Sequence, residues 1–523
     1  MKWLTGMALL CSISAFAQQS CDVLIRNGRI VDGTGNSWFY GDVAVKEGKI
    51  IAVGKLSGYS AAKTIDAQKM IVAPGFIDVH GHVESGIFER PTADNYIYDG
   101  VTTIVTGNCG SSADDLQKFF SRVDSLHAGI NIASLVGHNT VRAQVMHRDN
   151  RAPTPAEQQQ MDTLVAKAMQ DGAVGFSTGL IYIPGAFSKT DEVVELAKSA
   201  AQYNGVYTSH IRNEENKVVD AVNEAINIGR SANMPVEISH FKVSGKANWG
   251  RSGEILGLVQ QARKEGWDVT IDQYPYTASS TNLGVRLPDW ALAGGQDSIN
   301  ARLHNAATRA QIKKEMLEQL HSYKYKNYSY CVVAYYSADT SFNGKSITDI
   351  NKLLGRKSNA KHEAETIMDM VEKGGAQMVY HGMNEDDVRY IMQYPFCMVG
   401  ADAGVPTPGK GMPHPRAYGT NARILGKYVR EAKLIPLEEA IRRMTSLAAQ
   451  KFQLKDRGLL REGMAADIVI FDDQTIDDKA TFEVPHQYST GMQYVLVNGQ
   501  LELENGRHTG LRSGTPLYGP SKR

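Results

Sequence analysis

The chain of 523 residues has few cysteines, no excess of charge of either sign and no long apolar run. Its five cysteines are far apart and include no CxxC pair, which argues against a disulfide framework. Lysine plus arginine number 56, and aspartate plus glutamate also number 56, so the charge gives no indication of nucleic acid or an anionic membrane as a partner. No stretch approaches the roughly 20 consecutive apolar residues of a membrane span.

The first 17 residues have the pattern of a secretion signal. Lys2 precedes a short apolar run, and Ala15 and Ala17 match the A-x-A pattern that precedes a leader cleavage site. An apolar N-terminal helix is the alternative interpretation. A cleaved leader over 1–17 predicts an exported protein, periplasmic or secreted.

Short β-rich apolar runs recur through the middle of the chain, and each ends in a polar or otherwise distinctive residue. Most of these ends lie about 30 residues apart, the length of one strand, loop and helix unit. The runs cover 76–80, 101–105, 132–136, 174–176, 206–210, 236–240 and 269–272. Between them, Thr154 to Glu157 forms a helix capping box. Seven or more such units favour an α/β fold of the (β/α)8 TIM-like barrel type over an open sheet.

The rhythm stops after Asp272. The next strand that ends in a polar residue is 398–402, and 378–381 is a second candidate for the last barrel strand. We therefore predict a barrel over 74–446, with an inserted segment near 281–375 before its last strand.

Both ends of the chain alternate apolar and polar residues around turn signals. These signals are Asn27-Gly28, Glu47-Gly48 and Asn498-Gly499, which are typical of β-hairpins. We expect a small β-sandwich domain built from residues 18–73 and 447–523.

Four histidines, one cysteine and one aspartate stand at or just after the ends of predicted barrel strands. Two of the histidines are spaced i and i+2, which puts both rings on one side of a strand. Barrel enzymes place their chemistry at this C-terminal rim, and nitrogen and sulfur ligands favour zinc. Taken alone, the cysteine would be read as a buried small hydrophobe. The predicted metal ligands are His80, His82, Cys109, His210, His240 and Asp402.

A zinc ion at such a site lowers the pKa of bound water towards about 7, so that hydroxide can attack a carbonyl that the metal polarises. Hydrolysis of an amide or related bond is the expected reaction. Asp402 would take the proton from the water and pass it to the leaving nitrogen, a role compatible with that of a plain metal ligand. The motif Gly175-x-Ser177-x-Gly179 raises a serine hydrolase as the alternative, but no helix pattern follows it directly.

Several motifs carry a family resemblance. Pro74 to His82 (PGFIDVHGH), together with Arg461 to Ile470, resembles the amidohydrolase superfamily. Within it, GFSTGLIYIPG, SHIRNE, ISHFK, DQYPYT and HPR, in that order over 175–416, resemble the D-aminoacylases, which are N-acyl-D-amino-acid deacylases. The resemblance covers essentially the whole chain after the leader, and it implies a barrel with a small β-sandwich and an inserted segment.

The resemblance implies zinc-dependent hydrolysis of N-acyl-D-amino acids, including peptides that end in a D-residue. The partner is then a small-molecule substrate, and the sequence does not indicate an oligomeric state. A cyclic-amide hydrolase of the dihydroorotase or hydantoinase type is the second hypothesis. An exported barrel that binds zinc or an acyl amino acid without turnover is the third.

The resemblance also assigns roles to the metal ligands. Cys109, His210 and His240 would hold the tighter zinc, and the remaining three would form a second, weaker or vacant site. Cysteine in this position departs from relatives that use a carboxylated lysine or a glutamate as the bridge.

By the same resemblance, two cations and two hydroxyl groups grip the substrate carboxylate. These are Lys242, Tyr274, Ser280 and Arg416, with Ser279 as an alternative to its neighbour. Without the family, the two cations would be interpreted as solvated charges.

The pocket for the substrate side chain leaves two specificities open. In the family that the chain resembles, the positions of Tyr182, Tyr380 and Met383 line this pocket, and these residues favour an apolar D-side chain. Arg286, in a segment that reaches the same pocket in relatives, could instead pair with an acidic side chain; a surface arginine is its other interpretation.

Overall fold

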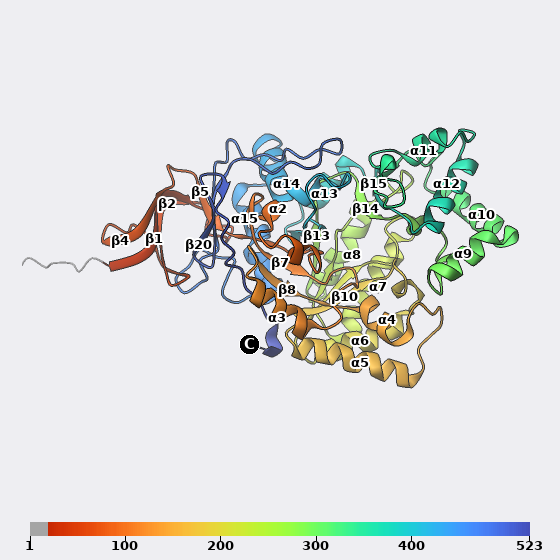
Figure 1. The fold of residues 1–523 in the computed structure, drawn as a ribbon. Coiled ribbons are helices and arrows are strands. Elements are labelled where there is room, and N and C mark those ends of the chain that lie inside the picture. Colours follow the sequence, from red (N-terminus) through yellow and green to blue (C-terminus); the bar gives the residue numbers. More distant parts are fainter. Residues whose placement is uncertain (1–18, 523) are drawn as a thin grey trace, which may run out of the picture.

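The computed structural model describes residues 19–522, so the predicted leader lies outside the described residues. Figure 1 shows a β domain built from the two ends of the chain, a central barrel, and an inserted helical segment on the far side. Within residues 19–522, no helix has the length and apolarity to cross a membrane.

The central part is the predicted barrel of eight parallel strands. Its strands are β6 (Phe76–Asp78), β7 (Val101–Thr106), β8 (Asn131–Ser134) with β9 (Val136–Gly137), β10 (Gly175–Gly179), β11 (Val206–His210), β12 (Val236–Ile238), β13 (Val269–Gln273) and β17 (Cys397–Val399). Parallel pairing runs from β6 to β8 and from β9 to β17. The ring closes where the Val79 amide donates to the Val399 carbonyl at 3.3 Å and Gly81 bridges Ala403. The (β/α)8 prediction is confirmed.

Helices cover the outside of the barrel because their apolar faces pack against the outward side chains of the strands. They include α3 (Leu116–Leu126), α4 (His138–Met146), α5 (Pro155–Gln170), α6 (Thr190–Ala201), α7 (Val218–Ala232), α8 (Ser252–Lys264), α13 (Glu385–Met392), α14 (Arg416–Arg423), α15 (Leu437–Met444) and α16 (Ser446–Lys451). The predicted capping box is present at the start of α5, where Thr154 and Glu157 each accept from the other's backbone amide.

The inserted segment has its own small sheet and core. Its sheet has the order β14 (Ser279–Asn282), β16 (Gln377–Tyr380), β15 (Cys331–Tyr335), and the helices α9 (Gln296–His304), α10 (Ala306–Ser322), α11 (Ile347–Leu353) and α12 (Ala360–Glu372) pack around it. The candidate barrel strand at 378–381 is therefore wrong: it is β16, antiparallel to both of its neighbours. The apolar run resembled a barrel strand because it is buried on both faces of this second sheet.

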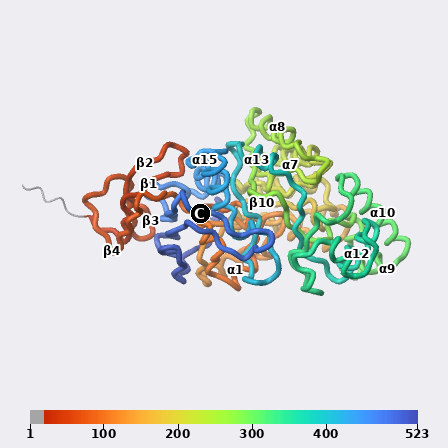
Figure 2. The backbone as a smooth tube through the Cα atoms, turned by 90° about the horizontal axis from the view of Figure 1, so that it is seen from above, coloured from red at the N-terminus to blue at the C-terminus, as the bar shows by residue number. Residues whose placement is uncertain are grey.

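Strands from both chain ends share one nine-stranded sheet. They are β1 (Gln19–Ile30), β2 (Phe39–Lys46), β3 (Lys49–Gly54), β4 (Tyr59–Asp66) and β5 (Ile71–Pro74) from the start, and β18 (Ile468–Phe471), β19 (Met492–Val497), β20 (Gln500–Glu504) and β21 (Arg507–His508) from the end. The two groups meet where β5 pairs with β18. Figure 2 shows the resulting contact between N-terminal and C-terminal strands from above.

The turn signals at Glu47-Gly48 and Asn498-Gly499 form hairpins, but Asn27-Gly28 does not. It is a bulge inside the continuous strand β1, where the pairing with β2 shifts register. Asn27 adopts a left-handed φ of 56°, and a Cβ on Gly28 would lie 2.5 Å from the side chain of Val72. The bulge lets β1 pair with β4 before it and with β5 after it.

A buried polar cluster joins the β domain to the barrel. Asp467, just before β18, is paired with the Arg457 guanidinium and accepts from Asn131 of barrel strand β8 at 3.0 Å. It also accepts the Asn498 amide at 2.8 Å. Beyond β21 the chain returns to the barrel, where the Leu517 amide donates to the Ile132 carbonyl at 2.8 Å. The C-terminal stretch 447–523 thus includes α16 and this tail as well as β-domain strands.

We expect Asp467→Ala to lower the free energy of unfolding by about 3–5 kcal/mol, because it removes the only buried carboxylate paired with Arg457 among the described residues and leaves this charge with the exposed Asp456 alone. Chemical denaturation followed by circular dichroism measures the change. Glu318→Ala removes an exposed i,i+4 pair with Lys314 and serves as the control, for which little change is expected. Equal stability of the two variants would contradict the joining role of Asp467.

Candidate metal centre

The structure brings all six predicted ligands together at the C-terminal rim of the barrel. His210 is the last residue of β11, and the others lie in the turns that follow β6, β7, β12 and β17. Cys109, His240 and Asp402 have left-handed backbones, with φ of 54°, 36° and 50°. Such conformations are unfavourable for residues other than glycine and concentrate at functional sites.

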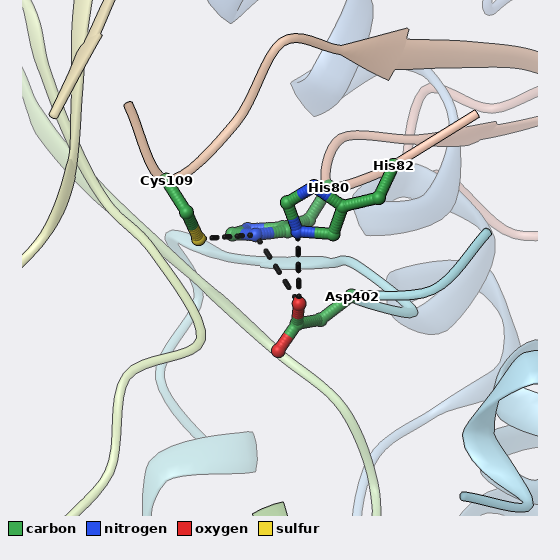
Figure 3. A group of neighbouring side chains, drawn as sticks. All are labelled: His80, His82, Cys109 and Asp402. Atoms are coloured by element: carbon green, nitrogen blue, oxygen red, sulfur yellow. Dashed lines mark hydrogen bonds and ion pairs between the residues drawn. The ribbon is translucent and has the colours of Figure 1, made fainter. Parts of the chain in front are cut away.

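One group of candidate metal ligands comes from the turns after β6, β7 and β17. The His80 Nε2 atom lies 3.2 Å from the Cys109 sulfur and 3.6 Å from Asp402 Oδ1. The His82 Nε2 atom lies 3.2 Å from the same carboxylate oxygen. Figure 3 shows these four side chains converging. Their metal-binding atoms all lie within 4.8 Å of one another.

A second group shares the same cysteine. The Cys109 sulfur lies 3.6 Å from His210 Nδ1 and 3.6 Å from His240 Nε2. The two imidazole centroids are 4.3 Å apart, nearly perpendicular to each other. Cys109 therefore lies between two sets of candidate ligands, in the position of a bridge.

The electrostatics of the donors fit a divalent cation. Burial lowers the pKa of His210 and of His240 well below the usual value, so both imidazoles are neutral and have a free lone pair. Burial raises the pKa of the Cys109 thiol well above its usual value, so a thiolate forms there only beside a cation. Nitrogen, sulfur and carboxylate donors together match the ligand preferences of zinc.

Two carboxylates hold the imidazole ligands from behind. Asp272 at the end of β13 lies 3.2 Å from His80 Nδ1 and accepts the His240 backbone amide at 2.9 Å. The Glu214 carboxylate lies 3.1 Å from His240 Nδ1. Such partners fix ring orientation and raise ligand basicity. Neither residue was predicted to be part of the site, although Asp272 ends a predicted strand and Glu214 follows His210 by four residues.

Asp402 is ionised in this arrangement. Its Oδ2 atom lies 2.8 Å from the Arg416 guanidinium. Burial favours the neutral acid, but the nearby Arg416 and His80 outweigh it and hold the pKa of Asp402 well below its usual range. The carboxylate can therefore accept a proton at neutral pH.

The predicted carboxylate grip comes together around one tyrosine ring. The Lys242 ammonium lies 5.6 Å and the Arg416 guanidinium 4.4 Å from the centre of the Tyr274 ring. Lys242 donates to Glu214 at 2.5 Å. The Ser280 hydroxyl is turned to β16, where it donates to the Met378 carbonyl at 2.8 Å. Ser280 nevertheless lines a cavity beside the metal centre.

Two cavities meet at this centre. An outer cavity of about 860 Å³ lies between the barrel rim and the inserted segment, and an inner one of about 50 Å³ extends under that segment. Tyr182 and Asp402 line both. Arg286 and Tyr380 line the inner cavity. Met383 lies behind Tyr274, another lining residue, and its sulfur is 3.9 Å from the Tyr274 hydroxyl.

Ser177 of the G-x-S-x-G motif does not have the environment of a catalytic nucleophile. Ser177 is fully buried within β10, its hydroxyl donates to the Gly107 carbonyl at 2.5 Å, and it accepts the Gly110 amide at 3.1 Å. A 3-10 turn over Gly185–Phe187 follows the strand, not the helix that a nucleophile elbow needs.

Comparisons with known proteins extend over both the barrel and the β domain. Residues 63–501 match the model of the amidohydrolase family. The chain is similar to an N-acyl-D-glutamate deacylase of Alcaligenes xylosoxydans xylosoxydans, 35% identical over 92% of this chain and 93% of that one. It is similar to a D-aminoacylase of the same organism, 34% identical over 95% and 98%. A solved N-acyl-D-glutamate deacylase from Bordetella bronchiseptica, complexed with zinc and a phosphonate mimic of the tetrahedral intermediate, is 36% identical, with a TM-score of 0.82 and coverage of 96% of this chain and 100% of that chain.

We expect Asp272→Asn to weaken metal binding about 10- to 100-fold, because the amide no longer anchors His80 and the His240 backbone as a carboxylate does. Titration of the metal-free protein with zinc against a competing chelator measures the affinity, and circular dichroism checks the fold. Asp297→Asn, an exposed substitution on α9, is the control. Unchanged affinity in a folded Asp272→Asn protein would contradict the supporting role.

Proposed function

This chain belongs to the amidohydrolase family, and from that premise we propose that it hydrolyses the amide bond of N-acyl-D-amino acids, releasing a D-amino acid and a carboxylate. The observation that carries the proposal is the position of Asp402. This single carboxylate contacts the metal ligands, pairs with Arg416 and lines both cavities. An amide bond placed beside it has its acyl group in one cavity and its amino acid in the other.

A divalent metal bound by these ligands lowers the pKa of water and polarises the carbonyl. We propose zinc in this role, with Cys109, His210 and His240 as the tighter set and His80, His82 and Asp402 as the weaker one. The donor types and the neutral state of the two buried imidazoles support this division.

Asp402 moves the proton. As an ionised carboxylate it accepts the proton of the attacking water and passes it to the amide nitrogen, so the C–N bond breaks and the amine leaves neutral. Its pairing with Arg416 fixes Oδ2 and leaves Oδ1 facing His80 and His82. The proton is thus accepted and released at Oδ1, on the side where the metal ligands converge.

Lys242, Arg416 and Tyr274 bind the α-carboxylate of the substrate. The two cations keep their charges despite burial. Desolvation lowers the pKa of each, but Glu214 raises the pKa of Lys242 and Asp402 raises that of Arg416, and these effects outweigh it. Carboxylate, scissile carbonyl and side chain are then each held at a different place, and three fixed points around Cα distinguish a D- from an L-amino acid.

The acyl group lies in the outer cavity. A volume of about 860 Å³ is far larger than an acetyl group needs, and Ile181, Leu283 and Val405 give it an apolar wall. We include peptides with a C-terminal D-residue among the substrates on this basis.

We also propose that the protein is exported. The pattern of residues 1–17 supports this, and the four cysteines of the described chain are free and buried, where they are protected from pairing in an oxidising compartment.

Paired N-acetyl-D- and N-acetyl-L-amino acids test the reaction. We expect release of the D-amino acid only, lost on chelation and restored by zinc. Ring opening of cyclic amides without any turnover of linear substrates would instead indicate a cyclic-amide hydrolase, and binding without turnover would indicate a binding protein. Chelator-resistant activity that Ser177→Ala abolishes would indicate a serine hydrolase.

We expect Asp402→Asn to lower kcat by about 10²–10⁴-fold, because the amide cannot shuttle the proton. Steady-state kinetics on the preferred N-acetyl-D-amino acid measure it, with metal content and thermal unfolding as checks on the site and the fold. Activity within twofold of the parent enzyme would contradict the assignment of Asp402 as the proton carrier.

A further inference from the structure

The inner cavity ends in a buried ion pair that the mechanism above does not use. Arg286 is only 7% exposed, and its Nη2 atom lies 3.4 Å from Glu215 Oε1. The Tyr323 hydroxyl donates to the other carboxylate oxygen at 3.1 Å. Glu215 follows barrel strand β11, whereas Arg286 lies in the 3-10 turn η2 (Leu283–Arg286) of the inserted segment. The pair therefore exists only because the insertion closes over the barrel.

Hydrogen-bonding capacity remains open beside this pair. Among the described residues, Arg286 Nε has no hydrogen-bond partner, and no group accepts a hydrogen bond from the buried Tyr325 hydroxyl, which has only the Lys246 backbone amide beside it. Besides the contact with Glu215, the Arg286 guanidinium donates to the Tyr330 hydroxyl at a long 3.3 Å. Buried polar groups are normally satisfied, so unmatched donors on two residues that line the inner cavity point to a ligand atom that accepts hydrogen bonds.

The walls leading to this polar end are aromatic. The Arg286 guanidinium lies 5.1 Å from the centre of the Tyr380 ring, and Tyr325 stacks on Tyr330 at 3.9 Å. Such walls suit the methylene groups of a side chain, while the end of the cavity suits a polar group.

The charge at this end is balanced, and this decides what kind of polar group fits. Arg286 and Glu215 together carry no net charge. A substrate carboxylate would compete with Glu215 for Arg286 and add a second buried anion. An aliphatic side chain would leave the open donors unsatisfied. A primary amide satisfies both partners, because its oxygen accepts from Arg286 and its nitrogen donates to Glu215.

The other cation of the inner cavity lies at the opposite, metal-proximal end. Lys242 donates to Glu214 and contacts His240 Nδ1 at 2.9 Å. It is thus placed for the α-carboxylate, and Arg286 is left for the side chain.

We infer that the inner cavity selects D-amino acids whose side chain ends in an uncharged amide, D-glutamine and D-asparagine, and that Glu215 sets this selectivity by neutralising Arg286. The inference rests on the proposed function, since it concerns the side chain of the same N-acyl-D-amino acid.

The kcat/KM values for the N-acetyl derivatives of D-glutamine, D-asparagine, D-glutamate and D-leucine test it. We expect the better of the two amides to exceed D-glutamate and D-leucine by at least about tenfold, the scale on which a missing or unpaired buried polar partner is discriminated. Higher values for D-glutamate or D-leucine would overturn the inference and leave the proposed function standing. No turnover of any of the four by zinc-loaded enzyme would overturn the proposed function itself.

The variant Glu215→Gln isolates the charge. It keeps the size of the side chain but leaves Arg286 without a counter-charge, so we expect the ratio of D-glutamine to D-glutamate to fall at least tenfold and D-glutamate to become the better substrate. An unchanged ratio would overturn the role of Glu215. Zinc content equal to that of the parent shows that the neighbouring Glu214 still supports the metal centre.

Glu224→Gln is the matched control. Glu224 also pairs with a partly buried arginine, Arg212, at 2.9 Å, and its side chain is 13% exposed against 12% for Glu215. Neither member of that pair lines the cavity. The control should leave the substrate ratio unchanged. Inhibition of the parent enzyme by free D-glutamine and D-glutamate tests the same preference without any substitution: stronger inhibition by D-glutamine is expected, and stronger inhibition by D-glutamate would count against the inference.

Discussion

The arrangement of this protein depends on the exclusion of water from a group of metal-binding side chains at the barrel rim. Burial keeps His210 and His240 neutral and keeps the Cys109 thiol protonated unless a cation is beside it. The same burial that makes these side chains good ligands would make them costly without a metal. The left-handed backbones of Cys109, His240 and Asp402 add conformational strain, and the packing of the surrounding barrel must stabilise these conformations.

Charges around this centre are compensated in pairs. Asp272 and Glu214 support the imidazoles, Glu214 also pairs with Lys242, and Asp402 pairs with Arg416. Each cation needed for a substrate carboxylate thus has an anion beside it in the free enzyme, which limits the cost of burying it. The Arg286–Glu215 pair repeats this design at the far end of the inner cavity, where our inference places the substrate side chain.

The inserted segment turns an open barrel rim into two cavities. Its strands β14 and β16 and its turn η2 supply Ser280, Tyr380 and Arg286, while the barrel supplies the metal ligands. In the proposed function the metal chemistry therefore lies on the barrel alone, whereas side-chain recognition is shared between the inserted segment and Glu215 of the barrel. The β domain contacts the barrel on another side, through Asp467 and Asn131, and none of its described residues lines either cavity.

The sequence alone determined the barrel and the six candidate ligands, because each ligand follows an apolar run and strand ends of a parallel barrel share one rim. It did not determine that Asn27-Gly28 is a bulge, since a left-handed asparagine before glycine suits a turn and a bulge equally, and only pairing with β4 and β5 decides between them. Nor did it separate β16 from a barrel strand, because burial on both faces gives the same apolar run in either sheet. The tertiary structure alone brought Glu215 to Arg286 across 71 residues. A residue type specifies which charges a chain carries, but only packing between distant segments decides which of them neutralise each other.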